Sequence, residues 1–135
     1  MCLGTELKDQ KQAIRRITDR HGFIRVWKLV FNDSDRFVGP YYQKDGYESG
    51  INVAKESCYD WGFHAFRNEK SAKIWASAYS EPLGFTIIQC LALPEWVVEC
   101  GHLNRLATIK FTKLCFPEYP KKKVTIKEFR KALSS

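Results

Sequence analysis

Short segments rich in β-branched and aromatic residues recur along the chain, with turn residues between them. The longest of these segments cover residues 23–31 (FIRVWKLVF) and 85–93 (FTIIQCLAL). This composition is typical of strands. The second segment is almost wholly apolar, which predicts a central position in a sheet. In the first, Arg25 and Lys28 fall on opposite faces, so we expect an edge or partly exposed strand.

Further strands are shorter. Residues 106–116 alternate apolar and polar side chains, which predicts a half-buried strand. Turn signals such as Gly39-Pro40 and Asp45-Gly46 separate the rest. Residues 62–66 and 96–100 are further expected strands, and residues 37–43 and 51–54 are possible short strands. We therefore expect an antiparallel or mixed sheet of about five or six strands.

Three segments have helical patterns. Thr5 could cap a first helix that runs to about Arg20 and ends at His21-Gly22. Asn68 is a typical N-cap, and the apolar residues after it recur with helical spacing. Thr125 and Glu128 form a capping-box pattern before a last helix. Strands and helices do not alternate regularly, so we predict one α+β domain spanning residues 1–135.

Length and composition exclude several classes of protein. With 135 residues, 44% of them hydrophobic, the chain can build its own core. No apolar run reaches the roughly 18 residues of a membrane span, and no short apolar stretch follows a charged start, so we expect neither a transmembrane helix nor a secretory signal. The five cysteines are scattered without a C-x-x-C pair, so a disulfide framework is not expected. We expect an intracellular, cytoplasmic protein.

Positive charge is concentrated in the C-terminal quarter. Residues 105–135 contain nine basic and two acidic residues, a net charge of +7, whereas residues 1–104 sum to zero. A local positive field of this kind attracts nucleic acid phosphates, anionic membrane surfaces or acidic protein surfaces. The alternative is an ordinary solvated helix face. The candidate residues for an anionic partner are Lys121, Lys122, Lys123, Lys127, Arg130 and Lys131.

A small-ligand site is a separate hypothesis. Tyr41, Tyr42 and Tyr47 lie in a glycine-containing stretch, and tyrosines in loops can stack on rings. They could equally cover the sheet as packed side chains. His64 lies in an apolar strand, either half-buried and satisfied by a backbone carbonyl or positioned to bind a ring or move a proton. These four residues are our candidate ligand-binding set.

The sequence offers little for metal or nucleophilic chemistry. Cys90, Cys100 and His102 lack a fourth ligand in a typical zinc spacing, so we expect no metal. Cys58 and His64 have no recognisable nucleophile–base spacing. Cys90 and Cys115 are better explained as small buried hydrophobes within strands. Catalytic residues are therefore not assigned.

Residues 62–93 resemble the central part of ADP-ribosyltransferase-like domains of the poly(ADP-ribose) polymerase branch. The resemblance rests on GFHAF (62–66), KSAKIWA (70–76) and GFTIIQCLAL (84–93), a strand, helix and strand in that order. It implies a domain that binds NAD or a related nucleotide. The family's NAD-binding pattern also has a histidine or arginine on the first strand and a glutamate on a late strand. This chain has Arg25 and Lys28 on the first strand, and its Glu99 lies outside residues 106–116.

Two functions therefore stand as hypotheses. The first is a small intracellular binding protein, without a cofactor, whose basic C-terminal surface contacts an anionic macromolecule. The second is an ADP-ribosyltransferase-like domain that binds NAD or a nucleotide, with or without transferase activity.

Overall fold

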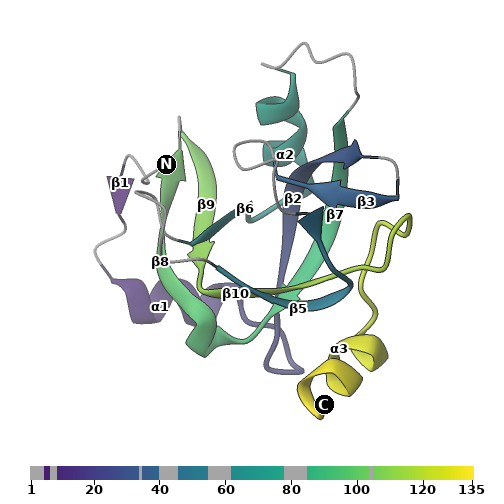
Figure 1. Ribbon diagram of the computed structural model, residues 1–135. Coiled ribbons are helices and arrows are strands. Elements are labelled where there is room, and N and C mark those ends of the chain that lie inside the picture. The colour runs from purple at the N-terminus through teal and green to yellow at the C-terminus, as the bar shows by residue number, and fades with distance from the viewer. Residues whose placement is uncertain are drawn as a thin grey trace.

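A strongly curved, mostly antiparallel sheet forms the body of the computed structural model, and three helices pack on it (Figure 1). The α+β architecture predicted from the sequence is confirmed. The structure describes residues 5–6, 9–33, 35–39, 46–54, 62–77, 85–103 and 105–135.

The helices are each eight residues long. Two of the three predicted N-caps are confirmed: Asn68 accepts a hydrogen bond from the backbone of Ser71, and Thr125 and Glu128 form the capping box. The helices are α1 (Gln10–Ile17), α2 (Glu69–Ala76) and α3 (Ile126–Leu133), and a 3-10 turn, η1, covers Pro94–Trp96.

The start of the first helix was predicted wrongly. Asp9, not Thr5, caps α1 by accepting a hydrogen bond from the backbone of Gln12. Thr5 instead belongs to a two-residue strand, paired with His102 in register. A contact between residues this far apart in sequence overrides the local capping signal.

Ten strands, more than the expected five or six, occur in the part of the chain that the structure describes. The excess comes from very short strands and from the bending of one predicted strand into two. The strands are β1 (Thr5–Glu6), β2 (Ile24–Asp33), β3 (Arg36–Val38), β4 (Gly46–Tyr47), β5 (Gly50–Val53), β6 (Phe63–Phe66), β7 (Phe85–Ala92), β8 (Val97–Leu103), β9 (Leu106–Phe111) and β10 (Lys113–Phe116).

The bend lies at Thr112, between β9 and β10. The amide of Thr112 donates to the carbonyl of Trp96. The carbonyl of Thr112 accepts from the amide of Ala54. The main strand order is β1-β8-β9-β6-β2-β7-β10-β5. Because β9 and β10 are consecutive, the path from β9 through β6, β2 and β7 returns to the same stretch of chain. The sheet thus curls on itself, with β10 crossing between its two halves (Figure 1).

β7 is central, as predicted, between β2 and β10. β2 is also central, which corrects the expected edge strand: it pairs with β7 over eight residues and also with β3 and β6. Its two faces pack against different partners. Ile24, Val26 and Val30 enter the main core, while α2 contacts β2, β6 and β7, with Trp75 packing against Phe66.

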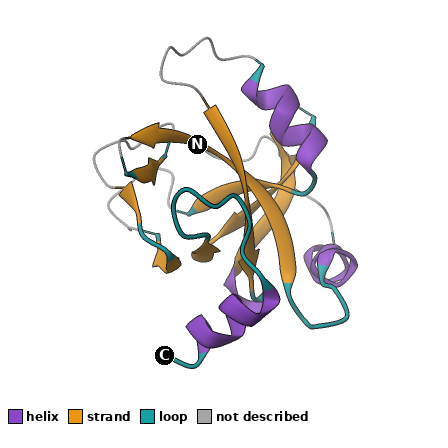
Figure 2. Cartoon of the chain, turned by 90° about the vertical axis from the view of Figure 1, so that its right-hand side faces the viewer, coloured by secondary structure: helices purple, strands orange, loops and turns teal. Residues whose placement is uncertain are grey.

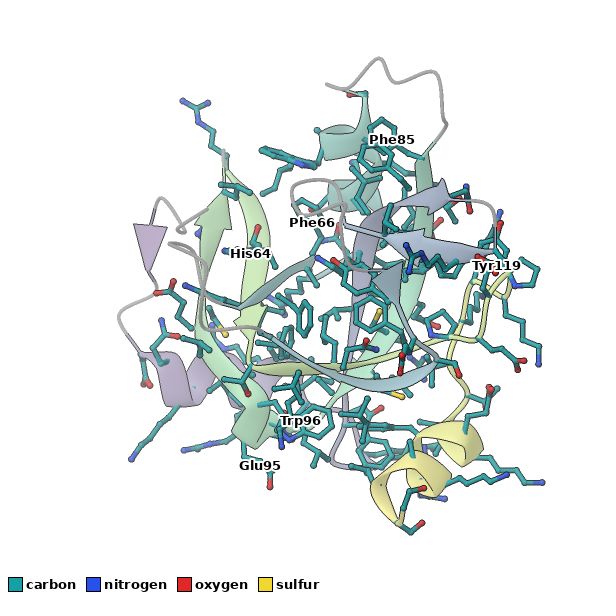
Figure 3. The ribbon with its side chains drawn as sticks, in the orientation of Figure 1. His64, Phe66, Phe85, Glu95, Trp96 and Tyr119 are labelled. Carbon is teal, nitrogen blue, oxygen red and sulfur yellow. The ribbon has the colours of Figure 1, made fainter. Side chains whose placement is uncertain are left out.

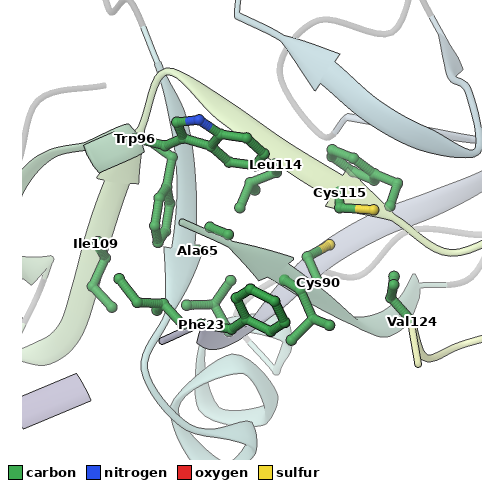
Figure 4. Close-up of a cluster of buried hydrophobic side chains, with 14 of the residues drawn as sticks. Phe23, Ala65, Cys90, Trp96, Ile109, Leu114, Cys115 and Val124 are labelled. Carbon is green, nitrogen blue, oxygen red and sulfur yellow. The ribbon is translucent and has the colours of Figure 1, made fainter. Parts of the chain in front are cut away.

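The interior of the curl contains the main core (Figure 4). Cys90 and Cys115 lie there as free thiols, 0% and 2% exposed, which confirms the prediction of small buried hydrophobes. Phe129 attaches α3 to this core by edge-to-face contacts with Phe23 and Trp96. Figure 2 shows α3 at the C-terminal end, well separated from α2.

Candidate functional site

A buried lysine lies where the sheet divides. β2 and β6 form one antiparallel bridge, between Trp27 and Phe66, and then separate. Beyond that bridge the carbonyl of His64 has no ladder partner on β2. The side chain of Lys28 fills the gap, and its Nζ donates to this carbonyl at 2.8 Å.

Aromatic rings surround the ammonium group of Lys28. Its Nζ is 5.9 Å from the ring centroid of Tyr47 and 5.9 Å from that of Phe63, within the range of a cation–π contact. Tyr47 stacks on Phe116 with ring centroids 4.2 Å apart. Lys28 is only 7% exposed, and burial lowers its pKa to about 8. Burial also raises the pKa of Tyr47, so its hydroxyl stays protonated.

The side chain of His64 lies on the face of β6 opposite to that of Phe63, its neighbour in sequence. Its register partner is Lys110 on β9, and Lys110 in turn pairs with Glu99 on β8. Directly paired residues share a face, so histidine, lysine and glutamate form one row across three strands. Gly62 adjoins this row, because a Cβ there would lie 2.8 Å from Cε of Lys110.

His64 is half-buried, and no residue in the described part of the chain forms a hydrogen bond with its Nε2. Burial lowers its pKa to about 3, with the cations of Lys28 and Lys110 acting in the same direction. The ring is therefore neutral at physiological pH. The expected satisfaction of a ring nitrogen by a backbone carbonyl does not hold for Nε2.

The candidate ligand-binding residues are only partly brought together. Tyr47 packs on Phe63, the neighbour of His64, but its ring lies with the inner core while the imidazole lies on the outer row. Tyr41 and Tyr42 fall outside the described residues. Lys28 connects Tyr47 and His64. The sequence predicted an edge or partly exposed strand for this segment, and only the apolar residues around Lys28 hinted at its burial.

A surface cavity of about 660 Å³ adjoins Tyr47. Three carboxylates and one guanidinium contribute to its wall, and His64 is not among the lining residues. In Figure 3 Tyr119, which lines this cavity, lies well apart from His64. The lining residues are Asp35, Arg36, Gly46, Tyr47, Glu48, Ser49, Glu118 and Tyr119.

All six cations of the predicted C-terminal surface are exposed: Lys121, Lys122, Lys123, Lys127, Arg130 and Lys131. We call these residues the basic surface. The backbone beneath them is ordered by β7, because the amide of Gln89 donates to the carbonyl of Lys122 at 2.7 Å. Val124 comes just before α3 and Phe129 lies within it, and both side chains are buried and hold α3 in place.

The acidic residue closest in sequence to these cations is already engaged. Glu128 accepts a hydrogen bond from the backbone of Thr125 at 3.0 Å, and these capping bonds, with a smaller effect of Lys121, lower its pKa. Among the described residues, no carboxylate forms an ion pair with any member of the basic surface. The surface also extends beyond the C-terminal quarter, since Arg130 contacts Nδ1 of His21 at 3.5 Å. Arg20, adjacent to His21, is exposed as well.

The remaining features concern metals, membranes and relatives. Within the described ranges, no group of three or more His, Cys, Asp or Glu side chains is arranged to hold a metal ion. No helix in this part of the chain is long and apolar enough to cross a membrane. Comparisons of the sequence with protein-family models and curated proteins, and of the fold with solved structures, find no significant match.

Proposed function

We propose that this chain is a small binding protein whose basic surface contacts an anionic macromolecule. The observation that carries the proposal is the set of six exposed cations, none of which pairs with a carboxylate of the described residues, on a capped helix and a β-bridged segment. The cap and the bridge order the backbone that carries these cations, which lowers the conformational entropy lost on binding. Nearby Arg20 enlarges the positive patch.

The test compares a triple substitution with a matched control. Changing Lys121, Lys122 and Lys123 together to glutamate removes half of the basic surface. Changing Lys11, Arg15 and Arg16 to glutamate alters the net charge equally on an exposed face of α1. Binding of each protein to a fluorescent DNA duplex and to a polyglutamate peptide is measured by anisotropy over a range of salt concentrations.

We expect the first variant to lose affinity and the control to stay close to wild type. For DNA, losing three phosphate contacts should flatten the log–log salt slope by roughly 2 to 3. Stronger binding to duplex than to polyglutamate at equal salt indicates a nucleic acid partner, and the reverse order an acidic protein. Equal loss in both variants would mean that only net charge matters, and the basic surface would drop out of the account.

A nucleotide-binding role is the second candidate, and the His64–Lys110–Glu99 row favours it. A buried imidazole nitrogen without a partner, beside a lysine, could receive a polar group of a ligand. This is the ADP-ribosyltransferase-like reading, with NAD as the ligand. Under it, millimolar NAD should raise the melting temperature, His64→Ala should abolish that rise, and a protein acceptor should become labelled if transferase activity is present. An unchanged melting temperature with NAD would rule this candidate out.

A further inference from the structure

Lys28 is a buried cation with no anionic partner among the described residues. Its ammonium has one hydrogen bond, to the neutral carbonyl of His64, and no carboxylate of the described residues pairs with it. Burying an unpaired charge is costly, and such a group avoids the cost by releasing its proton. An amine held in this way is a nucleophile at ordinary pH.

We propose that Lys28 is a reactive amine that condenses with a small aldehyde to form an imine. The lone pair of Nζ attacks the carbonyl carbon and forms a C–N bond. The resulting carbinolamine then loses its oxygen as water, which carries away both hydrogens of the amine, and a C=N bond remains. The step needs no oxidant or reductant.

The surroundings of Lys28 raise the fraction of its side chain that is a neutral amine, compared with an exposed lysine. The ionisable groups that face it are Tyr47 on β4 and Cys90 on β7, and the imidazole of His64 lies nearby on the other face of β6. Burial raises the pKa values of the Tyr47 hydroxyl and the Cys90 thiol and lowers that of the His64 imidazole, so none of the three is ionised near neutral pH. The pKa of Lys28 itself is about 8 against 10.5 for a free lysine. Near neutral pH this difference gives a roughly 300-fold larger fraction of neutral amine.

Tyr47 marks the route to this amine. Its ring covers Nζ of Lys28, and the same residue lines the cavity of about 660 Å³. Tyr47 is therefore common to the cavity and to the surroundings of the amine. Contacts with Phe116 and Phe63 hold the ring in place, so access requires its displacement.

The experiment treats the folded protein with acetaldehyde, traps imines with borohydride, and locates the ethylated lysines by peptide mass mapping. The exposed Lys121, Lys122 and Lys123 in the same sample serve as internal references. We expect Lys28 to react on the order of tenfold or more faster than each reference, with a half-maximal rate near pH 8. Tyr47→Leu should increase that rate further, and Lys28→Met should leave the reference lysines unchanged.

Faster reaction at Lys28 in either the wild type or Tyr47→Leu supports the proposal. If Lys28 reacts no faster than the references in both proteins, each shown to be folded by circular dichroism, the proposal is wrong. It is also overturned if Lys28 becomes modified only in urea, because the reactive species would then be the unfolded chain.

Discussion

The ammonium group of Lys28 takes the place of a missing strand neighbour for the carbonyl of His64. This arrangement has a cost, because the charged form is removed from water. Below pH 8 the folded state bears the full cost. Between pH 8 and 10.5 the folded state releases the proton while the unfolded state keeps it, so stability rises with pH over this window.

Lys28→Met therefore gives a pH-dependent change in stability. The free energy of unfolding of this variant minus that of wild type should be about 3 kcal/mol larger at pH 7 than at pH 10.5. The reason is that wild type gains stability over this pH range and the variant does not. Urea denaturation at the two pH values measures it. Lys127→Met, at an exposed position, is the control and should show no such dependence. An identical difference at both pH values would mean that Lys28 is not buried as a cation.

His64 gives the same sign of pH dependence as Lys28, in a lower pH window. Its pKa is lowered in the folded state, so its contribution to stability is present above pH 6.5 and is lost as pH falls toward 3. Between pH 6.5 and 5, wild type should lose about 2 kcal/mol relative to His64→Phe. Urea denaturation of the two proteins tests this, with the exposed His21→Phe as control. Parallel pH profiles for wild type and His64→Phe would contradict the buried, neutral imidazole.

At the scale of elements, the caps hold the basic surface in place. The hydroxyl of Thr125 accepts from the backbone of Glu128 at 3.1 Å, and the Glu128 carboxylate returns the contact. Thr125→Ala should lower the free energy of unfolding by about 1 kcal/mol, whereas Thr125→Ser should retain most of it. Chemical denaturation compares the two variants. If alanine and serine behave alike, the capping box does not stabilise α3.

Local signals identified the elements whose causes are local. The caps at Asn68 and Thr125 depend on residues three positions away, so sequence reasoning found both. Thr5 failed as a cap because its partner, His102, is remote in sequence. The burial of Lys28 could not be read from its own strand, since it depends on where β2 separates from β6. Periodicity within residues 106–116 likewise gave no sign of the bend at Thr112.

At the scale of the whole molecule, the fold brings a turn near the N-terminus beside the basic surface on the C-terminal segment. Sequence arithmetic assigned the positive excess to the last thirty-one residues. The fold adds the cation of Arg20, because Phe23 packs on Phe129 and places the preceding turn, with His21, beside Arg130. A sequence separation of 109 residues hid this neighbour relation.

The central claim is that the basic surface is where an anionic partner binds, and its most direct test is an NMR titration. Backbone amide resonances of the isotope-labelled protein are followed as a short DNA duplex or a polyglutamate peptide is added. We expect saturable shifts of the amide resonances concentrated at residues 121–131 and at Arg20 and His21, and weaker binding at higher salt. Changes concentrated instead on the His64–Lys110–Glu99 row, or no saturable change with either probe, would contradict it.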